Sequence, residues 1–282
     1  MSRNQTSWES KPHRGFLSRT LWQAGIFGAY FAQFVKMRLA YRMDFFVDTL
    51  AVSFSMLIQL AVLTTLFSKV KALEGWSFEQ VLFIYAFSLL PLGIFNIVSV
   101  NLYRFSDNYI IQGKFDRVLL RPVGTLAQVV FESFNVSGLN EILIGIAIMT
   151  YSGMKLGLDF GVQEILTLAI LAPSSALVYM GVFLAITSVS FWHEDRMGLA
   201  PPVYNIIRFS RYPITIYSLP VRILLTFVLP FAWVAFFPAT WFLGSAEFGR
   251  LALLTPLVGL VVFGGSVLIW QRGVHNYAST GS

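Results

Sequence analysis

The sequence predicts an all-α polytopic membrane protein with six transmembrane helices. Of its 282 residues, 56% are hydrophobic and only 12% are charged, whereas about a quarter of the residues of an ordinary soluble domain are charged. The apolar residues also gather into charge-poor runs of roughly 20 residues, the length that a helix needs to cross a bilayer. A soluble core can hold one such run, but not several in succession.

The chain begins with two segments that precede the first apolar run. Residues 1–16 are polar and contain neither the apolar core nor the small-residue cleavage site of a signal peptide, so we expect a flexible tail. Residues 17–42 are rich in aromatic side chains and end on a basic stretch, which is typical of a helix lying in the headgroup region. The alternative is that residues 17–42 extend the first span.

The six spans are the charge-poor runs that follow. Residues 123–152 would form about 45 Å of continuous helix, against a hydrocarbon core about 30 Å thick. We therefore expect a division near Val136–Gly138 into an interfacial lead-in and the third span, and a short re-entrant or interfacial turn at Phe237–Phe242. The expected spans are Phe45–Phe67, Val81–Tyr103, the run from Gly138 to Tyr151, Ile165–Trp192, Leu219–Phe237 and Leu251–Trp270.

A short charged segment between the second and third spans is amphipathic. Within residues 104–122, isoleucine, phenylalanine, valine and leucine alternate with lysine, aspartate and arginine. Gly113 allows the chain to turn, and Pro122 ends the helix because proline cannot extend it. We expect this segment to lie at the membrane surface, where it offers a rigid contact to a partner in the water phase.

The distribution of lysine and arginine predicts the orientation of the chain. Most of the 20 basic residues fall in the N-terminal region, the charged segment, the loop of residues 193–217 and the C-terminal end. The other side holds only Lys69, Lys71, Lys155 and Arg250. Because cytoplasmic loops carry the excess of positive charge, both termini are expected in the cytoplasm, including a tail of residues 273–282.

Several kinds of chemistry are missing from the sequence. There is no cysteine and no phosphate-binding loop of the G-x-x-x-x-G-K-[ST] type, since the one Gly-Lys pair, Gly113-Lys114, lacks the spacing. The three histidines are scattered and do not form a zinc motif, so we expect no metal site, no cofactor and no catalytic site in this chain. The net charge of +6 resides at the ends of apolar runs, and we therefore expect no nucleic-acid partner.

Acidic residues inside apolar runs are candidates for function, because a charge in the membrane is costly. Glu132 and Glu141 lie nine residues apart, on roughly opposite faces of a helix that turns by about 100° per residue. They cannot both line one narrow path on a straight helix. For Glu141 we expect an interfacial position or a buried ion pair with a cytoplasmic arginine, and a proton relay is the alternative.

Several stretches of the sequence, in order along nearly the whole chain, carry a resemblance to a known family. The first is the charged segment. The matching residues are Gly113, Asp116, Leu119, Leu120, Arg121 and Pro122, then Arg211, Tyr212, Pro213, Ile214, Ile216 and Tyr217, then Pro230, Phe237, Pro238 and Ala239, and the tail from Gly273 to Ser282. These stretches resemble the permease subunits of bacterial type-2 ABC exporters, more narrowly a subfamily formerly of unknown function.

The resemblance implies an ATP-driven exporter in the bacterial inner membrane. Two permease chains, identical or related, would assemble with two cytoplasmic ABC ATPase subunits, which would bind the ATP and magnesium. Residues 17–42 would form a connecting elbow helix within a transmembrane domain of residues 17–272, and residues 104–122 would hold the coupling helix. The docking residues would be Gly113, Phe115, Asp116, Arg117, Leu120, Arg121 and Pro122.

The resemblance leaves the substrate, and hence the substrate-binding residues, unknown. Two other classes of function remain open. A secondary transporter is one, although the two halves of the sequence show no convincing inverted repeat. A membrane assembly scaffold without transport activity is the other.

Overall fold

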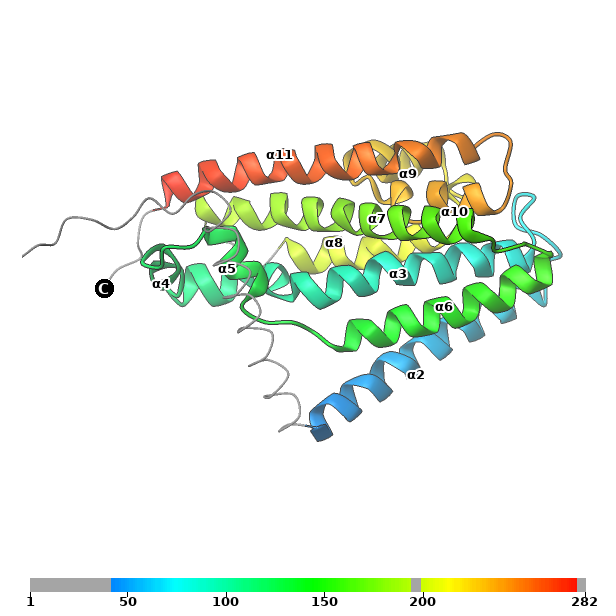
Figure 1. Ribbon diagram of the computed structural model, residues 1–282, viewed down its shortest axis with the longest axis horizontal. Helices are drawn as coiled ribbons and strands as arrows, with labels where there is room; N and C mark the ends of the chain where they lie inside the picture. The colour runs from blue at the N-terminus through cyan, green and yellow to red at the C-terminus, as the bar shows by residue number, and fades with distance from the viewer. Residues whose placement is uncertain (1–41, 194–198, 278–282) are drawn as a thin grey trace, which may run out of the picture.

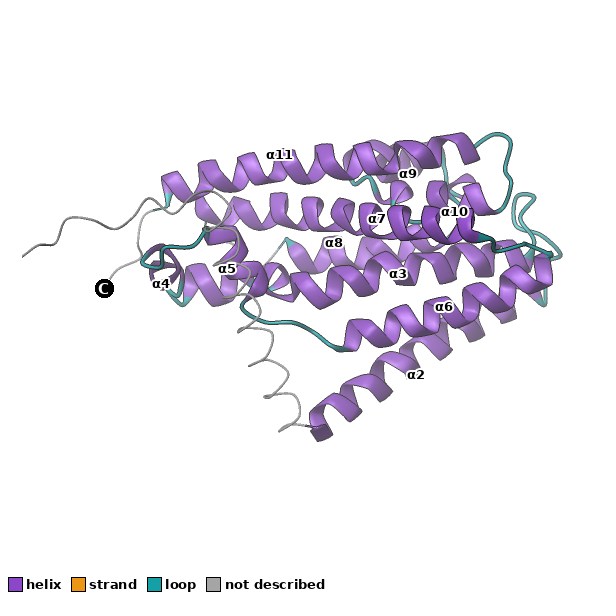
Figure 2. Ribbon diagram, in the orientation of Figure 1, coloured by secondary structure: helices purple, strands orange, loops and turns teal. Residues whose placement is uncertain are grey.

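The computed structural model describes residues 42–193 and 199–277. The tail predicted for residues 1–16 lies outside this part, as do nearly all of the elbow predicted for residues 17–42 and the last residues of the C-terminal tail, 278–282. The described part consists of helices joined by loops, without a strand (Figure 2). The predicted all-α class is therefore confirmed for this part of the chain.

Long helices lie along the long axis of the molecule and set its shape (Figure 1). They are α2 (Arg42–Phe67), α3 (Phe78–Tyr103), α6 (Ser137–Leu156), α7 (Val162–Ser188) and α11 (Thr255–Asn276). The shorter elements are η1 (Ser106–Ile111), α4 (Phe115–Leu119), α5 (Thr125–Phe131), η2 (Val189–Phe191), α8 (Ala200–Ile206), η3 (Ile207–Arg211), η4 (Ile214–Ile216), α9 (Leu219–Ile223), η5 (Leu224–Val228), η6 (Phe231–Trp233), α10 (Phe236–Phe242) and η7 (Gly249–Leu254).

Four helical stretches of the described part are long and apolar enough to cross a membrane, which makes the chain a multi-pass membrane protein. They are Thr49–Phe67, Phe78–Ser99, Val162–Phe191 and Gly249–Asn276. The bent pair that α9–η5 forms with η6–α10 would make a fifth span if it crossed as one unit. α6 has 20 residues, about 30 Å at the usual rise per residue, but it carries the polar pair Asn140 and Glu141 near its start.

The predicted division of residues 123–152 is confirmed. α5 ends at Phe131 and α6 begins at Ser137, so a short helix and a long helix replace one over-long helix. The predicted end of the sixth span at Trp270 is too early. Because α11 continues to Asn276, residues 273–276 belong to this helix and not to a tail.

Residues 200–217 run through the bundle, which corrects the prediction that residues 193–217 form a loop on the side of the charged segment. Figure 1 shows α8 lying beside α3. The ring of Tyr204 packs against Tyr103, at the C-terminal end of α3, with centroids 5.5 Å apart. The indole Nε1 of Trp76, just before the start of α3, donates to Thr215 Oγ1 over 2.9 Å. The segment therefore follows most of the length of α3.

The predicted fifth span, Leu219–Phe237, is a hairpin and not a straight helix. α9–η5 and η6–α10 meet at an angle of 73° around Pro230. The hairpin starts beside Thr215, since the Arg222 guanidinium donates to the carbonyl oxygens of Thr215 and Tyr217. α10 returns to the same end of the bundle, where Phe242 packs against Phe83 near the start of α3. Apolar length alone thus did not predict this bend.

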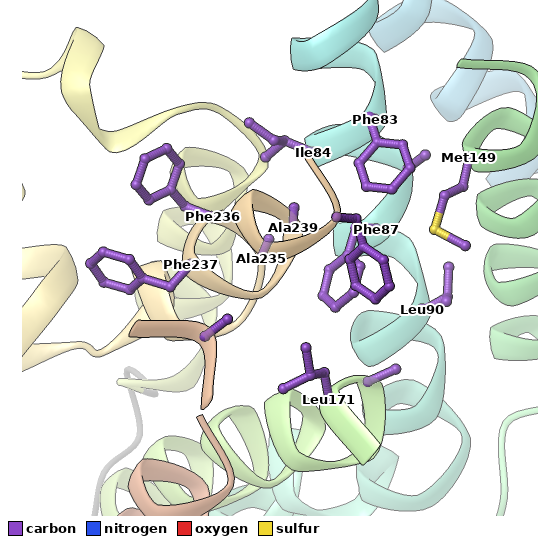
Figure 3. Packing of buried hydrophobic residues seen from close by; sticks show 14 of the residues in the cluster. Phe83, Ile84, Phe87, Leu90, Met149, Leu171, Ala235, Phe236, Phe237 and Ala239 are labelled. Carbon is purple, nitrogen blue, oxygen red and sulfur yellow. The ribbon is translucent and has the colours of Figure 1, made fainter. Parts of the chain in front are cut away.

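The hairpin is anchored by the largest group of buried apolar side chains. The group includes Phe236 and Ala239 of α10, Phe83 and Phe87 of α3 and Leu171 of α7, and Figure 3 shows Ala239 on the side of α10 that faces α3. All five are buried. Burial of such side chains contributes roughly 1.5–3 kcal/mol each, so the hairpin is a fixed part of the bundle.

The helices of the bundle differ strongly in burial. α3 lies at the centre, and 78% of its apolar stretch is buried, whereas only 11% of the apolar stretch of α2 is buried. α2 is attached through two buried apolar side chains, Met56 and Leu63, which pack against α3. Polar contacts add to the attachment, among them the Asn140 amide, which donates to Ser53 Oγ over 2.9 Å. The exposed face of α2 is apolar, as expected for a surface in contact with lipid or with another chain.

Gly93 and Gly138 allow α3 and α6 to touch through their backbones. A Cβ atom added at Gly93 would lie 2.5 Å from the Gly138 carbonyl oxygen, and one added at Gly138 would lie 2.5 Å from the Gly93 carbonyl oxygen. We expect Gly93→Ala to lower the midpoint of thermal unfolding in detergent, since overpacking costs about 1–3 kcal/mol. Gly264→Ala is the matched control because nothing lies within 4 Å of the added Cβ. Equal midpoints for the two variants would contradict the close contact.

Candidate functional site

The residues between α3 and α6 cap one end of the bundle. η1, α4 and α5 lie where α3, α7 and α11 end (Figure 1). We call this the α4 end, and the other, where the α2–α3 loop lies, the opposite end. The charged segment of residues 104–122 thus occupies a surface to which three long helices contribute their C-terminal ends.

Local chemistry fixes the fold of this cap. Gly113 has φ of 65°, in the left-handed region that favours glycine, and this turn separates η1 from α4 as the sequence predicts. The Gln128 amide of α5 donates to the carbonyl oxygens of Val118 and Val123 over 3.1 and 2.6 Å. These bonds tie α5 to the last turn of α4 and to the chain just beyond it, so α5 acts as a brace for α4.

Phe115 holds α4 against the bundle. Its ring is fully buried and packs with centroid distances of 5.0 Å against both Phe191 and Tyr277. Phe105 and Trp270 complete the group, which we call the aromatic cluster: Phe105, Phe115, Phe191, Trp270 and Tyr277. Trp270 Nε1 also donates to Thr125 Oγ1 of α5 over 3.1 Å. Phe115 therefore anchors α4 in this structure and offers no docking surface, which revises its predicted role.

The other predicted docking residues form the surface of the cap. Leu120 is 85% exposed and follows directly on α4. Arg117, Arg121 and Pro122 are exposed, whereas Gly113 and Asp116 are partly buried. The tip of the cap thus joins the exposed apolar side chains of Leu119 and Leu120 to two arginines, an arrangement suited to a protein partner.

Two tyrosines connect the cap to its surroundings through carboxylates. The Tyr109 hydroxyl of η1 donates to Glu132, and burial together with this carboxylate raises the pKa of Tyr109. Burial and the nearby Asp116 carboxylate raise the pKa of Tyr277 to about 12. Both tyrosines are therefore neutral at physiological pH. Asp116, a predicted docking residue, thus also faces the end of α11.

The residues of the aromatic cluster other than Phe115 were missed as functional candidates. Phe191, Trp270 and Tyr277 stand at or just beyond the ends of apolar runs, where aromatic residues are common as interface anchors. Their positions alone do not distinguish an anchor in the headgroup region from a partner of Phe115. The sequence does contain a signal for this cluster, because aromatic residues stand at those ends of three apolar runs that must lie on the same side of the membrane.

The environment of Glu141 differs from the predicted ion pair. Its carboxylate accepts a hydrogen bond of 2.7 Å from the Asn96 amide of α3. The nearby charge is Arg211, which lies inside the bundle and donates to Gln59 of α2. Glu132 lies at the C-terminal end of α5, before the break that separates α5 from α6. Its carboxylate accepts a hydrogen bond from the Tyr109 hydroxyl. The two acids therefore do not share a path, as the sequence predicts.

The comparisons with known proteins agree with this architecture. The family model described as "ABC-2 family transporter protein" matches residues 54–281. The search of curated proteins and the search of solved structures each found no match. The family match covers the span helices, the cap and the hairpin. The chain belongs to the family of ABC-2 transporter proteins, as a membrane-spanning permease subunit that works with ABC ATPase subunits.

Proposed function

We propose that this permease is part of an exporter in the bacterial inner membrane, and that the exposed tip of the cap is where an ATPase subunit docks. The observation that carries the proposal is the contrast between two residues at the two ends of α4. Leu120 is exposed, whereas Phe115 is buried among the ends of α7 and α11. A movement of the tip would therefore be transmitted to α7 and α11 through the packed aromatic rings.

The proposed mechanism is a rigid-body movement driven by the ATPases. ATP binding brings ATPase subunits together, and a docked cap would follow them. A ligand shifts an equilibrium only through its different affinity for the two states, and packed interfaces move as units. Because Phe115, Phe191 and Trp270 pack closely, α7 and α11 would move with the cap. The ATP and magnesium would belong to the partner, and this chain would contribute no catalytic group.

We further propose six passes with both termini in the cytoplasm. The passes would be α2, α3, α6, α7, the segment α8–η4 and α11, with the hairpin α9–α10 re-entering at the outer side. Arg211 lies within the bundle and Arg222 lies at the opposite end. Neither arginine therefore adds to the positive charge of the cytoplasmic side. The orientation now rests on Lys114, Arg117 and Arg121 of the cap and on the basic residues that precede α2 in the sequence.

Co-purification in mild detergent tests the proposal. Mass spectrometry of the purified chain is expected to find an ATPase with a phosphate-binding loop, in a ratio of one to each permease chain. A second permease sequence in the sample would indicate a heterodimer, and its absence a homodimer. Recovery of the chain without any ATPase, under conditions that preserve a reference ABC transporter, would contradict the proposal and favour a secondary transporter or a scaffold.

A further inference from the structure

A polar cleft opens inside the bundle near the α4 end. It has a volume of about 300 Å³ and lies between α3, α6 and α8, with one residue of α2 at its edge. The volume is at the lower end of the range of small-molecule sites, roughly 300–1,000 Å³. Its lining residues are Val52, Phe95, Asn96, Ser99, Tyr103, Arg104, Asn135, Ser137, Gly138, Glu141 and Tyr204.

Glu141 gives the cleft a buried carboxylate. Its side chain is 8% exposed, and the Asn96 amide donates to Oε2. Arg211 is close enough to interact with this carboxylate electrostatically, but its Nη1 donates to Gln59 and its guanidinium lies over the Tyr85 ring. An ionisable group at this depth is costly and suggests function.

Two buried hydroxyl groups in the same lining have no partner in the described part of the chain. Ser99 is 0% exposed and Ser137 is 5% exposed, and the Oγ atom of each makes no hydrogen bond there. Buried polar side chains nearly always have a partner, and an unpaired one costs about 1–3 kcal/mol of desolvation. Both hydroxyls line the cleft beside Glu141, so the cleft presents three oxygen groups that can accept hydrogen bonds.

The rest of the lining defines which ligand fits. The rings of Tyr103 and Tyr204 pack edge to face at 5.5 Å, and together with Phe95 they form aromatic walls of the type that attract cations. Arg104 is exposed at the α4 end of the cleft. A positively charged nitrogen bearing hydrogens would satisfy the carboxylate and both hydroxyls, and an adjacent anionic group would meet Arg104.

We propose that this cleft binds the ammonium head group of an amphipathic molecule. The molecule bears N–H donors, which pair with Glu141, Ser99 and Ser137, and its apolar part leaves past Val52 of α2. Two sources share this chemistry: an ethanolamine phospholipid of the membrane, whose phosphate would reach Arg104, and an amphipathic amine from the cytoplasm. The inference deepens the proposed function by naming a substrate class, and it rests on that function for the view that the bound molecule is transported.

Photo-crosslinking tests the site directly. The full chain is placed in phosphatidylcholine nanodiscs and labelled with a dodecylamine that carries a diazirine near its nitrogen. The expected labelled peptides come from α3 and α6. Glu141→Gln is expected to reduce labelling about tenfold through loss of a charge-assisted hydrogen bond, and the fold is retained because glutamine still accepts from Asn96. Glu247→Gln, an exposed acid of the loop at the opposite end, is the control for net charge and should label like the unchanged chain.

Ser99→Ala separates ligand binding from structural support. Its hydroxyl has no partner in the described part, so its removal should leave the thermal midpoint unchanged or higher while labelling falls several-fold. Unchanged labelling in both Glu141→Gln and Ser99→Ala, or labelling confined to peptides outside the cleft, would overturn the proposal.

Competition distinguishes the two sources. Both dodecylamine and phosphatidylethanolamine present N–H donors, whereas dodecyltrimethylammonium has the charge without donors. Competition by phosphatidylethanolamine at membrane concentrations would assign the site to lipid, and competition by dodecylamine alone would assign it to an amine. Equal competition by dodecyltrimethylammonium would contradict the hydrogen-bonding role of the cleft. Labelling needs no ATPase, so its failure in a chain that still co-purifies with ATPase would refute this inference and leave the proposed function standing.

Discussion

Replacing Leu120 with glutamate is expected to reduce the ATPase that co-purifies with the chain by about 30-fold to 100-fold, since an exposed apolar residue at the centre of an interface contributes roughly 2–3 kcal/mol. Leu120 is 85% exposed and stands between the two arginines of the tip. Its replacement removes the apolar contact and places a carboxylate in the interface. Because it has little contact with its own chain, the thermal midpoint of the isolated permease should not change.

The matched control is Val70→Glu. Val70 is an exposed apolar residue of the α2–α3 loop, so the same chemical change is made at the opposite end of the bundle. This variant should retain the ATPase at the level of the unchanged chain. The measurement is the ratio of ATPase to permease after purification, determined by quantitative mass spectrometry. A normal ratio for Leu120→Glu would exclude the tip of the cap as the docking surface.

Replacing Phe115 with alanine is expected to have the largest effect on the cap itself. The ring is fully buried among four other aromatic rings, and truncation of a buried phenylalanine costs about 3–5 kcal/mol. The cost falls on the attachment of α4 to η2, which continues α7 and supplies Phe191, and to α11, which supplies Trp270. Hydrogen exchange of residues 104–131 should increase by about two orders of magnitude or more, and ATPase activity should no longer depend on substrate.

Phe227→Ala is the control for this variant. Phe227 is 77% exposed on the hairpin, so its truncation leaves no cavity and should change neither hydrogen exchange nor ATPase recovery. The two variants of the cap differ in their expected signature. Leu120→Glu loses the partner and keeps the cap, whereas Phe115→Ala loosens the cap and weakens the partner as a result. Normal hydrogen exchange in Phe115→Ala would refute the anchoring role of this residue.

The sequence predicts those features that depend on chain length and on local backbone chemistry. The break between α5 and α6 follows because residues 123–152 exceed the thickness of a bilayer. The turn at Gly113 follows because glycine adopts a positive φ without strain, and the structure has φ of 65° there. Both conclusions use information that lies within one short stretch of sequence.

The predictions from sequence fail for segments whose composition does not indicate the course of the chain through the fold. Residues 200–217 include three prolines and Arg208 and Arg211, so their composition predicts a polar loop. They run along α3 because Arg211 and Thr215 find partners on α2 and beside α3. Residues 219–237 are apolar enough to span, but the chain bends by 73° at the break around Pro230. Hydropathy measures the cost of burial in lipid and does not record such partners.

For the same reason, composition alone could not predict which residues of the charged segment reach its surface. The sequence places the docking residues in one amphipathic segment, but composition does not tell which apolar residues face the bundle. Phe115 is buried and Leu120 is exposed, although both read as apolar. The difference arises from Phe191, Trp270 and Tyr277, which lie far along the chain and meet only once the fold has formed.

The bond between Gln59 and Arg211 sets a condition on how the protein is made. The two residues are 152 positions apart in the sequence. At about 5–20 residues per second, the ribosome needs roughly 8–30 s to supply Arg211 after it has supplied Gln59. During that interval α2, with its exposed apolar face and its unpaired amide, must be held by lipid or by the insertion machinery. Docking of α2 is therefore a late event of biogenesis, and a chain truncated before Arg211 would leave this helix detached and exposed to quality-control proteases.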